Sequence, residues 1–243
     1  MSLYVYCLGD GLRESAFEGL AGVGGARVRV LTLGGFAAVV SEAGDEAAAV
    51  NEENLLAHNR VNAAALAAAT PLPCRFGTRA AAERLAEYVS ANEAALSAAL
   101  ARVRGRVEMS VKLMLKAEGQ KPEVEGEGGE SPRASAGGAG RGAAGAGTAF
   151  LLKKRREMLG EEGARRRAEG AAAWLAEGLA GLARETAERL SPSEAIIVRA
   201  AHLVERARVS EYRARLRSLA AGRGDLRLLV SGPWPPYSFG DVG

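Results

Sequence analysis

The sequence predicts an α+β protein with two domains. Short runs rich in β-branched and aromatic residues alternate with long alanine-rich runs, which is typical of strands alternating with helices. In the first half these runs follow the order strand, helix, hairpin, helix, strand, which is the βαββαβ order of a ferredoxin-like sheet. We therefore expect an N-terminal α+β domain over residues 1–105 and a second domain, with strands and helices alternating again, over residues 106–243.

Each element of the N-terminal domain is predicted from a local pattern. The pair Gly34-Gly35 between two β-rich runs indicates a hairpin. Asp45 is placed to cap an alanine-rich helix, and Thr78 to cap a second, amphipathic one. The expected elements are a strand at 3–8, a short helix at 12–20, hairpin strands at 27–33 and 36–41, a helix at 46–69, an edge strand at 72–76 and a helix at 79–104.

The second domain begins with the clearest strand of the chain, because residues 107–115 alternate between apolar and mostly polar side chains. Residues 118–148 contain ten glycines and no leucine, isoleucine or aromatic residue. We expect a flexible Gly/Ala insertion there rather than a folded element. The remaining expected elements are a long helix at 150–190, a strand at 195–204, a helix at 210–221 and a strand at 226–231.

The long helix carries a repeat of apolar residues. Leu175, Leu179 and Leu182 are followed by Thr186 and Leu190 at spacings of three and four residues, with Arg and Glu beside them. This spacing is typical of a coiled-coil seam. We therefore name Leu175, Leu179 and Leu182 as candidate partner-binding residues.

Composition argues against several classes of protein. No run reaches the roughly 18 apolar residues that a membrane-spanning helix needs, and we expect no signal peptide at the opening residues. Two cysteines are too few for a disulfide scaffold or a structural zinc site. The 32 basic and 29 acidic residues leave a net charge of +3, which is too balanced to indicate nucleic acid binding. We expect a cytoplasmic location.

Residues of the types used in catalysis and in metal or cofactor binding are few and lie far apart in the sequence. His58 and His202 lie in a helix and a strand with no nucleophile motif beside them, so we expect both to be structural. The G-x-G-x-x-G pattern at residues 140–145 lacks the preceding strand and following helix that dinucleotide binding needs. Cys7 and Cys74 fall on neighbouring strands of a ferredoxin-like sheet, so their thiols can lie close together. We expect no cofactor, no metal site and no catalytic residue, and therefore not an enzyme.

Two basic clusters, at residues 153–156 and 165–167, fall on the long helix. Binding of single-stranded nucleic acid would call for stacking aromatic residues beside them. The sequence instead interleaves glutamates, which favour ion pairs between successive turns on a solvated helix face. We therefore expect neither a nucleic acid nor a membrane as partner.

Aromatic residues are concentrated at the end of the chain. Three of the twelve, Trp234, Tyr237 and Phe239, stand among prolines that exclude a central strand. This tail either docks on its own domain as an aromatic clamp or presents a motif to a partner, and the two roles are compatible. We name Trp234, Tyr237 and Phe239 as candidate partner-binding residues.

One set of motifs runs in order across nearly the whole chain. It comprises YVY at 4–6, AAVVSE at 37–42, HNRV at 58–61, LPCRFGT at 72–78, GRVEMSVK at 105–112 and SGPWPPYSF at 231–239. In these motifs and their spacing the sequence resembles the gas vesicle protein F/L family. It departs from the family pattern at Cys74, where an aliphatic residue is usual, and at Met109-Ser110, which replaces a Trp-Gly-like pair.

The resemblance implies a minor gas vesicle protein, located at the gas vesicle, that takes part in vesicle assembly or structure. The implied partners are the small, hydrophobic shell-forming protein and other accessory gas vesicle proteins. The implied fold has two α+β domains, the second a modified ferredoxin-like fold with a helical coiled-coil part. The alternative is a cytoplasmic enzyme or small-molecule binder that uses the ferredoxin-like sheet.

Overall fold

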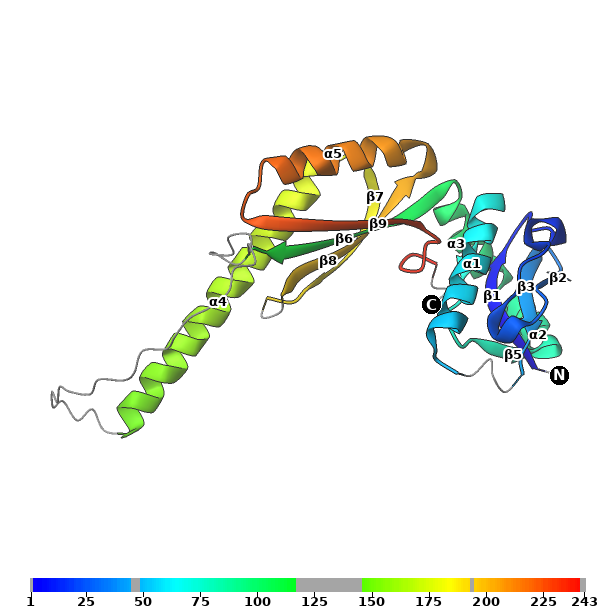
Figure 1. Ribbon diagram of the computed structural model, residues 1–243, viewed down its shortest axis with the longest axis horizontal. Helices are drawn as coiled ribbons and strands as arrows, with labels where there is room; N and C mark the ends of the chain where they lie inside the picture. Colours follow the sequence, from blue (N-terminus) through cyan, green and yellow to red (C-terminus); the bar gives the residue numbers. More distant parts are fainter. Residues whose placement is uncertain (1, 45–48, 117–145, 193–194, 241–243) are drawn as a thin grey trace, which may run out of the picture.

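The structure is a computed structural model that describes residues 2–44, 49–116, 146–192 and 195–240, and the side chains of these residues outside 146–159. Figure 1 shows an elongated molecule with a sheet and helices at one end, a second sheet in the middle, and helix α4 (Ala146–Gly178) projecting at the other end. The predicted α+β class is confirmed, since two antiparallel sheets are each accompanied by helices.

The N-terminal sheet has β1 at its centre and the strand order β2-β3-β1-β4, with antiparallel neighbours. The short strand β5 pairs with the first residues of β1, and β4 with its last. This is the ferredoxin-like order, because the first strand lies between the third and the fourth. The strands are β1 (Ser2–Gly9), β2 (Arg29–Leu33), β3 (Phe36–Glu42), β4 (Leu72–Pro73) and β5 (Arg79–Ala81).

Several predicted elements of this half are wrong in type or extent. In place of a helix at 12–20 there is one short 3₁₀ turn, η1 (Glu14–Phe17), and a second, η2 (Val23–Gly25), follows it. Helix α1 (Glu52–Ala68) begins later than expected; Asn51 caps it by accepting a hydrogen bond from the Asn54 amide at 2.8 Å, and the predicted cap Asp45 lies outside the described residues.

The predicted edge strand at 72–76 shortens to the two residues of β4, and the predicted helix at 79–104 is divided. Its first residues form β5, and the rest form α2 (Ala82–Ala91) and α3 (Glu93–Val103). Thr78 caps no helix, because its hydroxyl donates a hydrogen bond to the Arg75 carbonyl at 2.7 Å.

The second sheet repeats the strand order of the first. Its order is β7-β8-β6-β9, so the first strand of this half again lies between the third and the fourth. The elements are β6 (Arg106–Leu115), α4, β7 (Ala183–Leu190), β8 (Ile196–Glu205), η4 (Arg206–Arg208), α5 (Val209–Ala221) and β9 (Leu226–Trp234).

The predicted coiled-coil seam at 175–190 is wrong. Helix α4 ends at Gly178, Gly181 takes a φ of 77°, and residues 183–190 form strand β7, which pairs with β8 along its length. A positive φ favours glycine and interrupts a helix. The side chains of Leu175, Leu179 and Leu182 are buried in the core beneath α4 and α5, so these leucines hold the domain together rather than form a helical seam.

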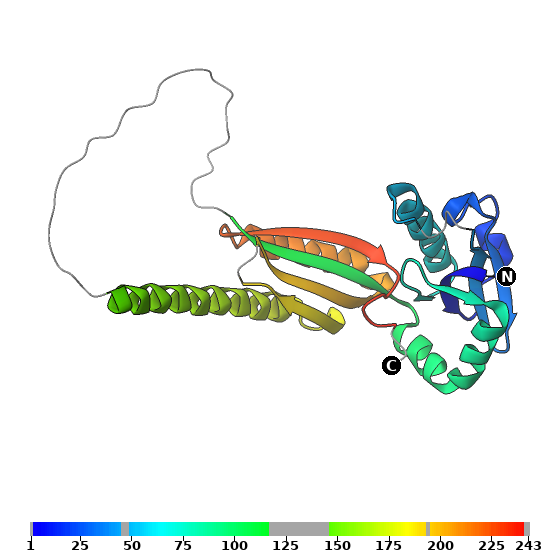
Figure 2. The same ribbon diagram turned by 90° about the horizontal axis from the view of Figure 1, so that it is seen from below.

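The helices cover both faces of the first sheet, whereas α4 and α5 share one face of the second sheet. In the first half, α1 packs on one face and α2 with α3 on the other. In the second half, the last turns of α4 and all of α5 pack on the same face of the sheet. Figure 2 looks onto the opposite face, with α5 behind the strands and the N-terminal sheet beyond one end. Part of this second face therefore carries no helix.

The glycine-rich insertion predicted at 118–148 lies almost entirely outside the described residues, together with the pattern at 140–145; its last three residues belong to α4. Within the described parts of the chain, no helix combines the length and the apolar character that a bilayer crossing demands. The domain boundary between residues 105 and 106 stays a prediction, since residues 235–240 return to pack near the first sheet.

Candidate functional site

The aromatic tail joins the two halves of the protein. After β9 the chain turns through Pro235 and Pro236, which are both buried. Phe239 is 3% exposed and packs in the core formed by β1, α2 and α3. The Tyr237 hydroxyl lies 3.2 Å from Nε2 of His58 on α1. The tail therefore docks as predicted, but it reaches across to the N-terminal half rather than staying on its own domain.

Polar contacts reinforce this junction. The Glu108 carboxylate on β6 accepts hydrogen bonds from the Ser238 amide at 2.7 Å and the Ser238 hydroxyl at 3.1 Å, and burial raises the pKa of Glu108. Arg102 on α3 donates from Nε to both oxygens of Glu185 on β7, at 3.0 and 2.9 Å. Arg206 donates to the Leu66 carbonyl at 2.6 Å. Elements of both halves are thus tied together at several points.

His58 is the centre of a buried hydrogen-bond network. Its Nδ1 lies 3.0 Å from the Tyr4 hydroxyl, and the Asn62 side-chain amide lies 3.1 Å from its Nε2. Burial lowers the pKa of His58 to about 4 and raises the pKa of Tyr4 to about 12. His58 is therefore neutral at neutral pH and connects β1 and α1 to the tail.

His202 serves a similar purpose in the second half. Its Nδ1 lies 2.6 Å from the hydroxyl of Tyr212 on α5, and burial lowers the pKa of His202 to about 4. The side chains that contact the two imidazole rings through hydrogen bonds belong to tyrosine and asparagine, not to the serine or cysteine of a nucleophilic site. Both arrangements fix packed elements to each other.

Cys7 and Cys74 lie on adjacent strands, since Cys7 of β1 is opposite Pro73 of β4. Both are free thiols. Burial raises the pKa of Cys7 well above its ordinary value and that of Cys74 to about 12. A thiol that stays protonated is a poor nucleophile, so neither is poised for reaction.

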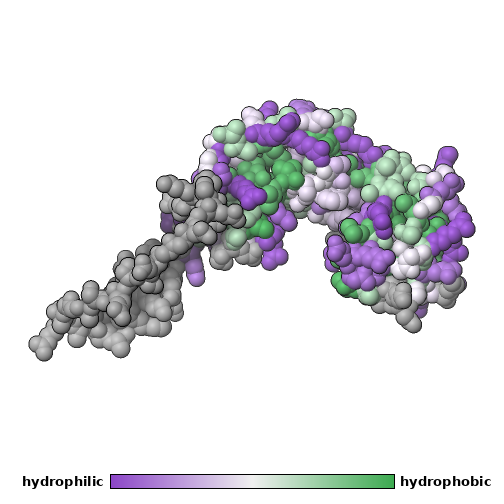
Figure 3. Space-filling view, viewed as in Figure 1, coloured by the Kyte–Doolittle hydropathy of each residue, from purple (hydrophilic) through white to green (hydrophobic). Residues whose placement is uncertain are grey.

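Four exposed apolar side chains lie on β6 and β9 of the second sheet, while Val50, Leu55, Leu56 and Tyr88 are exposed in the N-terminal half. Trp234 is 42% exposed, and Leu115, Leu229 and Val230 are each 40 to 41% exposed. Figure 3 shows apolar side chains over the region where β6 ends and β9 begins. We call Leu115, Leu229, Val230 and Trp234 the β9 patch. Of the predicted tail aromatics, only Trp234 belongs to it, because Tyr237 and Phe239 face the junction.

The β9 patch was largely missed by sequence reasoning. The one available signal was the run Leu228, Leu229, Val230, which breaks the alternation of a strand with one wet face. The register explains the consequence: Val230 lies opposite the inward-facing Val111, while Leu229 lies opposite the exposed Lys112. Consecutive apolar residues on an outer strand leave both faces of the sheet edge apolar.

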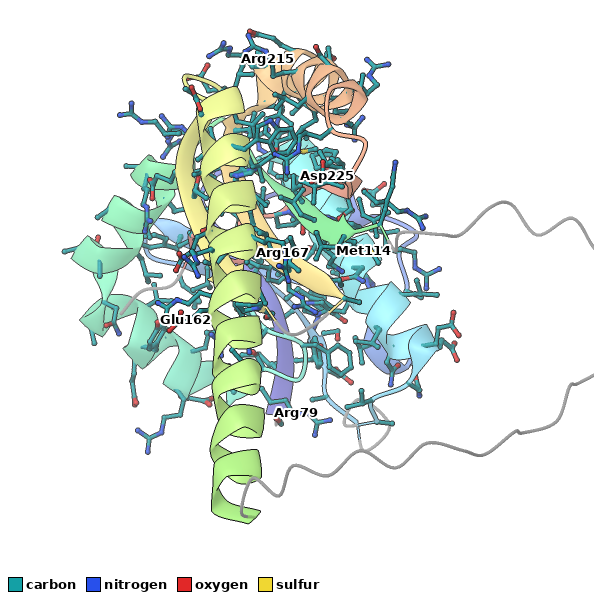
Figure 4. All side chains as sticks on the ribbon, turned by 90° about the vertical axis from the view of Figure 1, so that its left-hand side faces the viewer. Arg79, Met114, Glu162, Arg167, Arg215 and Asp225 are labelled. Atoms are coloured by element: carbon teal, nitrogen blue, oxygen red, sulfur yellow. The ribbon has the colours of Figure 1, made fainter. Side chains whose placement is uncertain are left out.

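The described basic residues of α4 form ion pairs along the helix. Arg165 lies 2.8 Å from Glu169, and Arg166 lies 3.8 Å from Glu162, each pair one turn apart. Figure 4 shows Glu162 and Arg167 on this helix. This is the solvated, charge-paired face that the interleaved glutamates predict. The cluster at residues 153–156 lies where side chains are not described.

A cavity of about 460 Å³ lies between the N-terminal sheet and helices α2 and α3. Its wall is largely aliphatic, and the Cys74 thiol and the Thr78 hydroxyl line it as well. Among the described residues, no group of three or more histidine, cysteine, aspartate or glutamate side chains is placed to hold a metal ion.

Fold and site together define an architecture of two ferredoxin-like sheets clamped by an aromatic tail. The sequence matches the family model described as gas vesicle synthesis protein GvpL/GvpF over residues 2–241, and the chain therefore belongs to this family. No curated protein matches it.

Two solved structures share the fold. The crystal structure of the gas vesicle protein GvpF from Anabaena sp. PCC7120 is 20% identical, with a TM-score of 0.76 over 100% of this chain and 99% of that one. The crystal structure of GvpF from Microcystis aeruginosa is also 20% identical, with a TM-score of 0.72 over 99% of both chains.

Proposed function

We propose that this protein binds the small, hydrophobic shell-forming protein of the gas vesicle, together with other accessory gas vesicle proteins, and acts at the vesicle during its assembly. Family membership supports a gas vesicle role. The observation that carries the binding role is the β9 patch, in which Leu229, Val230 and Trp234 lie on the outer strand of the second sheet and Leu115 lies on the neighbouring strand β6. Exposed apolar side chains along the outer edge of a sheet are typical of a protein interaction site.

The position of the patch suits capture of a chain that would otherwise aggregate. Among the described strands, β9 pairs only with β6, so its outer row of backbone groups is open to an added strand. The register places Leu229 on one face of the sheet and Val230 on the other, so an added segment meets apolar contacts on both sides. Backbone hydrogen bonds supply affinity and the side chains supply selectivity in this mode of recognition.

A co-expression pull-down with the shell-forming protein tests the proposal. The variant Leu229→Ser, Val230→Thr, Trp234→Ser removes the apolar side chains of β9, and we expect it to lose most of the captured shell-forming protein. The matched control is Leu55→Ser, Leu56→Ser, Tyr88→Ser, which removes three exposed apolar side chains from α1 and α2. Unchanged capture by the β9 variant, or equal loss in the control, would overturn the proposal.

The competing function is a small-molecule binder that uses the cavity beside α2. Its volume lies within the range of about 300–1,000 Å³ that ligand sites occupy. The wall carries polar side chains, among them Arg75, Arg84 and Tyr88, but the thiol in it, Cys74, is held protonated. The apolar edge of β9 therefore supports binding of a protein better than the cavity supports catalysis.

A further inference from the structure

The outer edge of β9 carries cations beside the apolar side chains of the β9 patch. Helix α5 packs alongside β9 and runs in the opposite direction (Figure 1). Arg213 of α5 donates a hydrogen bond to the Gly232 carbonyl of β9 at 2.6 Å, which places one flank of the helix along this strand. Residues four apart on a helix share a face, so the exposed Arg217 lies on the same flank as Arg213.

Arg217 lies beside an apolar position that α5 leaves open. Because α5 and β9 run in opposite directions, Arg217 lies next to residues of β9 that precede Gly232. One of these is Val230, which is on the face that α5 covers, since the residue opposite it, Val111, belongs to the core beneath this helix. Val230 is nevertheless 40% exposed. The helix therefore places a cation beside the strand edge without covering it.

The other face of the same edge also carries a cation. Arg227 is exposed and stands two residues before Leu229, and side chains two apart on a strand share a face. We call Arg213, Arg217 and Arg227 the edge arginines. Along β9 the apolar residues 228–230 thus have Arg227 at one end and Arg213 at the other.

The described residues leave the edge arginines without a carboxylate. None of the ion pairs among them involves an edge arginine. The two carboxylates that are close to the edge arginines in sequence are paired elsewhere, Asp225 with Arg223 at 2.8 Å and Glu211 with Arg208 at 2.9 Å. The edge of β9 is therefore positively charged as well as apolar, and a partner of opposite charge is attracted to it.

The same charges argue against a second copy of this chain on β9. Two copies paired edge to edge would bring their edge arginines together in either strand direction, because cations stand at both ends of the apolar run. Like charges across paired strands are destabilising, and charged side chains on an edge strand commonly prevent such self-pairing. A segment of another protein that carries carboxylates meets no such repulsion.

We propose that the segment that adds to β9 is acidic as well as apolar: a short extended stretch of a partner protein whose apolar residues are flanked by carboxylates. Its apolar side chains contact Leu229 and Val230, and its carboxylates pair with the edge arginines. This rests on the strand addition proposed above and specifies the charge of the segment that is captured. Exposed charge pairs are screened by salt, so binding should weaken as the salt concentration rises.

Fluorescence anisotropy on the full chain tests this with a labelled synthetic peptide that has a short valine-rich centre between glutamates. The test variant is Arg217→Glu, Arg227→Glu. The matched control is Arg13→Glu, Arg60→Glu, which makes the same change in net charge at exposed positions of the N-terminal half. We expect the test variant to bind the peptide about tenfold more weakly than the original chain, and the control to bind within about twofold of it.

A second peptide, with lysine in place of glutamate, reverses the expectation. The test variant should bind it about tenfold more tightly than the original chain does. A misfolded variant would show no such gain, so the pair of peptides separates charge from structural damage. Equal weakening of glutamate-peptide binding in the test and control variants, or no gain with the lysine peptide, would overturn the proposal.

Further arms separate the possible occupants and the two proposals. A concentration-dependent dimer of the original chain that Leu229→Ser, Val230→Thr, Trp234→Ser abolishes would assign the edge to a second copy. Binding of a single-stranded oligonucleotide that the test variant loses would assign the arginines to nucleic acid, and either result overturns the proposal. If the apolar variant still binds the glutamate peptide, strand addition at β9 is itself wrong. If the apolar variant loses the peptide and the test variant keeps it, only the charge of the segment is wrong.

Discussion

Acid is expected to destabilise this protein through its two buried histidines. Burial lowers the pKa of both His58 and His202 from 6.5 to about 4 in the folded chain. As the pH falls below 6.5, the unfolded chain takes up these protons first, so the free energy of unfolding falls. Between pH 7 and pH 5 the loss is about 2 kcal/mol for each histidine, and it continues until the pH reaches about 4.

The variant His58→Gln isolates one of the two contributions. Glutamine keeps a donor and an acceptor near Tyr4 and Tyr237 but does not titrate, so the variant should lose about 2 kcal/mol less than the original chain over the same interval. Urea unfolding followed by circular dichroism at a series of pH values measures this difference. The buried Glu108, with its raised pKa, acts in the opposite direction in both chains and cancels in the comparison.

Comparing how the free energy of unfolding changes with pH in the two chains separates the effect of titration from that of structural damage. A substitution in a buried network lowers stability at every pH, but only the loss of a titrating group changes the pH dependence. If His58→Gln and the original chain show the same dependence between pH 7 and pH 5, then His58 is not held neutral by burial and the reasoning fails.

Three further outcomes are expected. Phe239→Ala should lower the free energy of unfolding by about 3 kcal/mol in urea titrations, because it empties a buried position in the N-terminal core; a value below about 1 kcal/mol would contradict docking of the tail. Gly181→Ala should cost about 1 kcal/mol, since it places a side chain at a φ of 77° with no neighbour to contact; an unchanged unfolding midpoint would argue against this helix end. Cys7 should not react with a thiol reagent until the chain unfolds, because it is buried and protonated; rapid modification of Cys7 in the folded protein would contradict its burial.

Local patterns predicted much of the fold where one periodicity clearly dominated. The alternation of residues 107–115 gave β6 almost to the residue, and the two glycines after Leu33 gave the turn between β2 and β3. Residues 183–190 were assigned to the wrong class because Ala183, Ala187 and Leu190 fit a helix as well as a strand. These residues form a strand because they pair with β8, a contact that the local sequence pattern does not reveal.

The site was harder to predict because it depends on distant contacts. His58 and Tyr237 are 179 residues apart, and nothing in either segment indicates that they meet. The aromatic and proline content of the tail indicated that it is unusual, but not which residues are buried. In the structure Tyr237 and Phe239 lie in the junction and Trp234 lies at the surface.

The position of Phe239 bears on how the chain is made. Leu3 is translated well before Phe239, and the two side chains belong to the same core. On the ribosome the first sheet therefore emerges long before the side chain that completes its packing exists. Packing of the N-terminal core is therefore completed only after the second half has been translated. A chain that stops before Phe239 leaves a gap in the core of the N-terminal half.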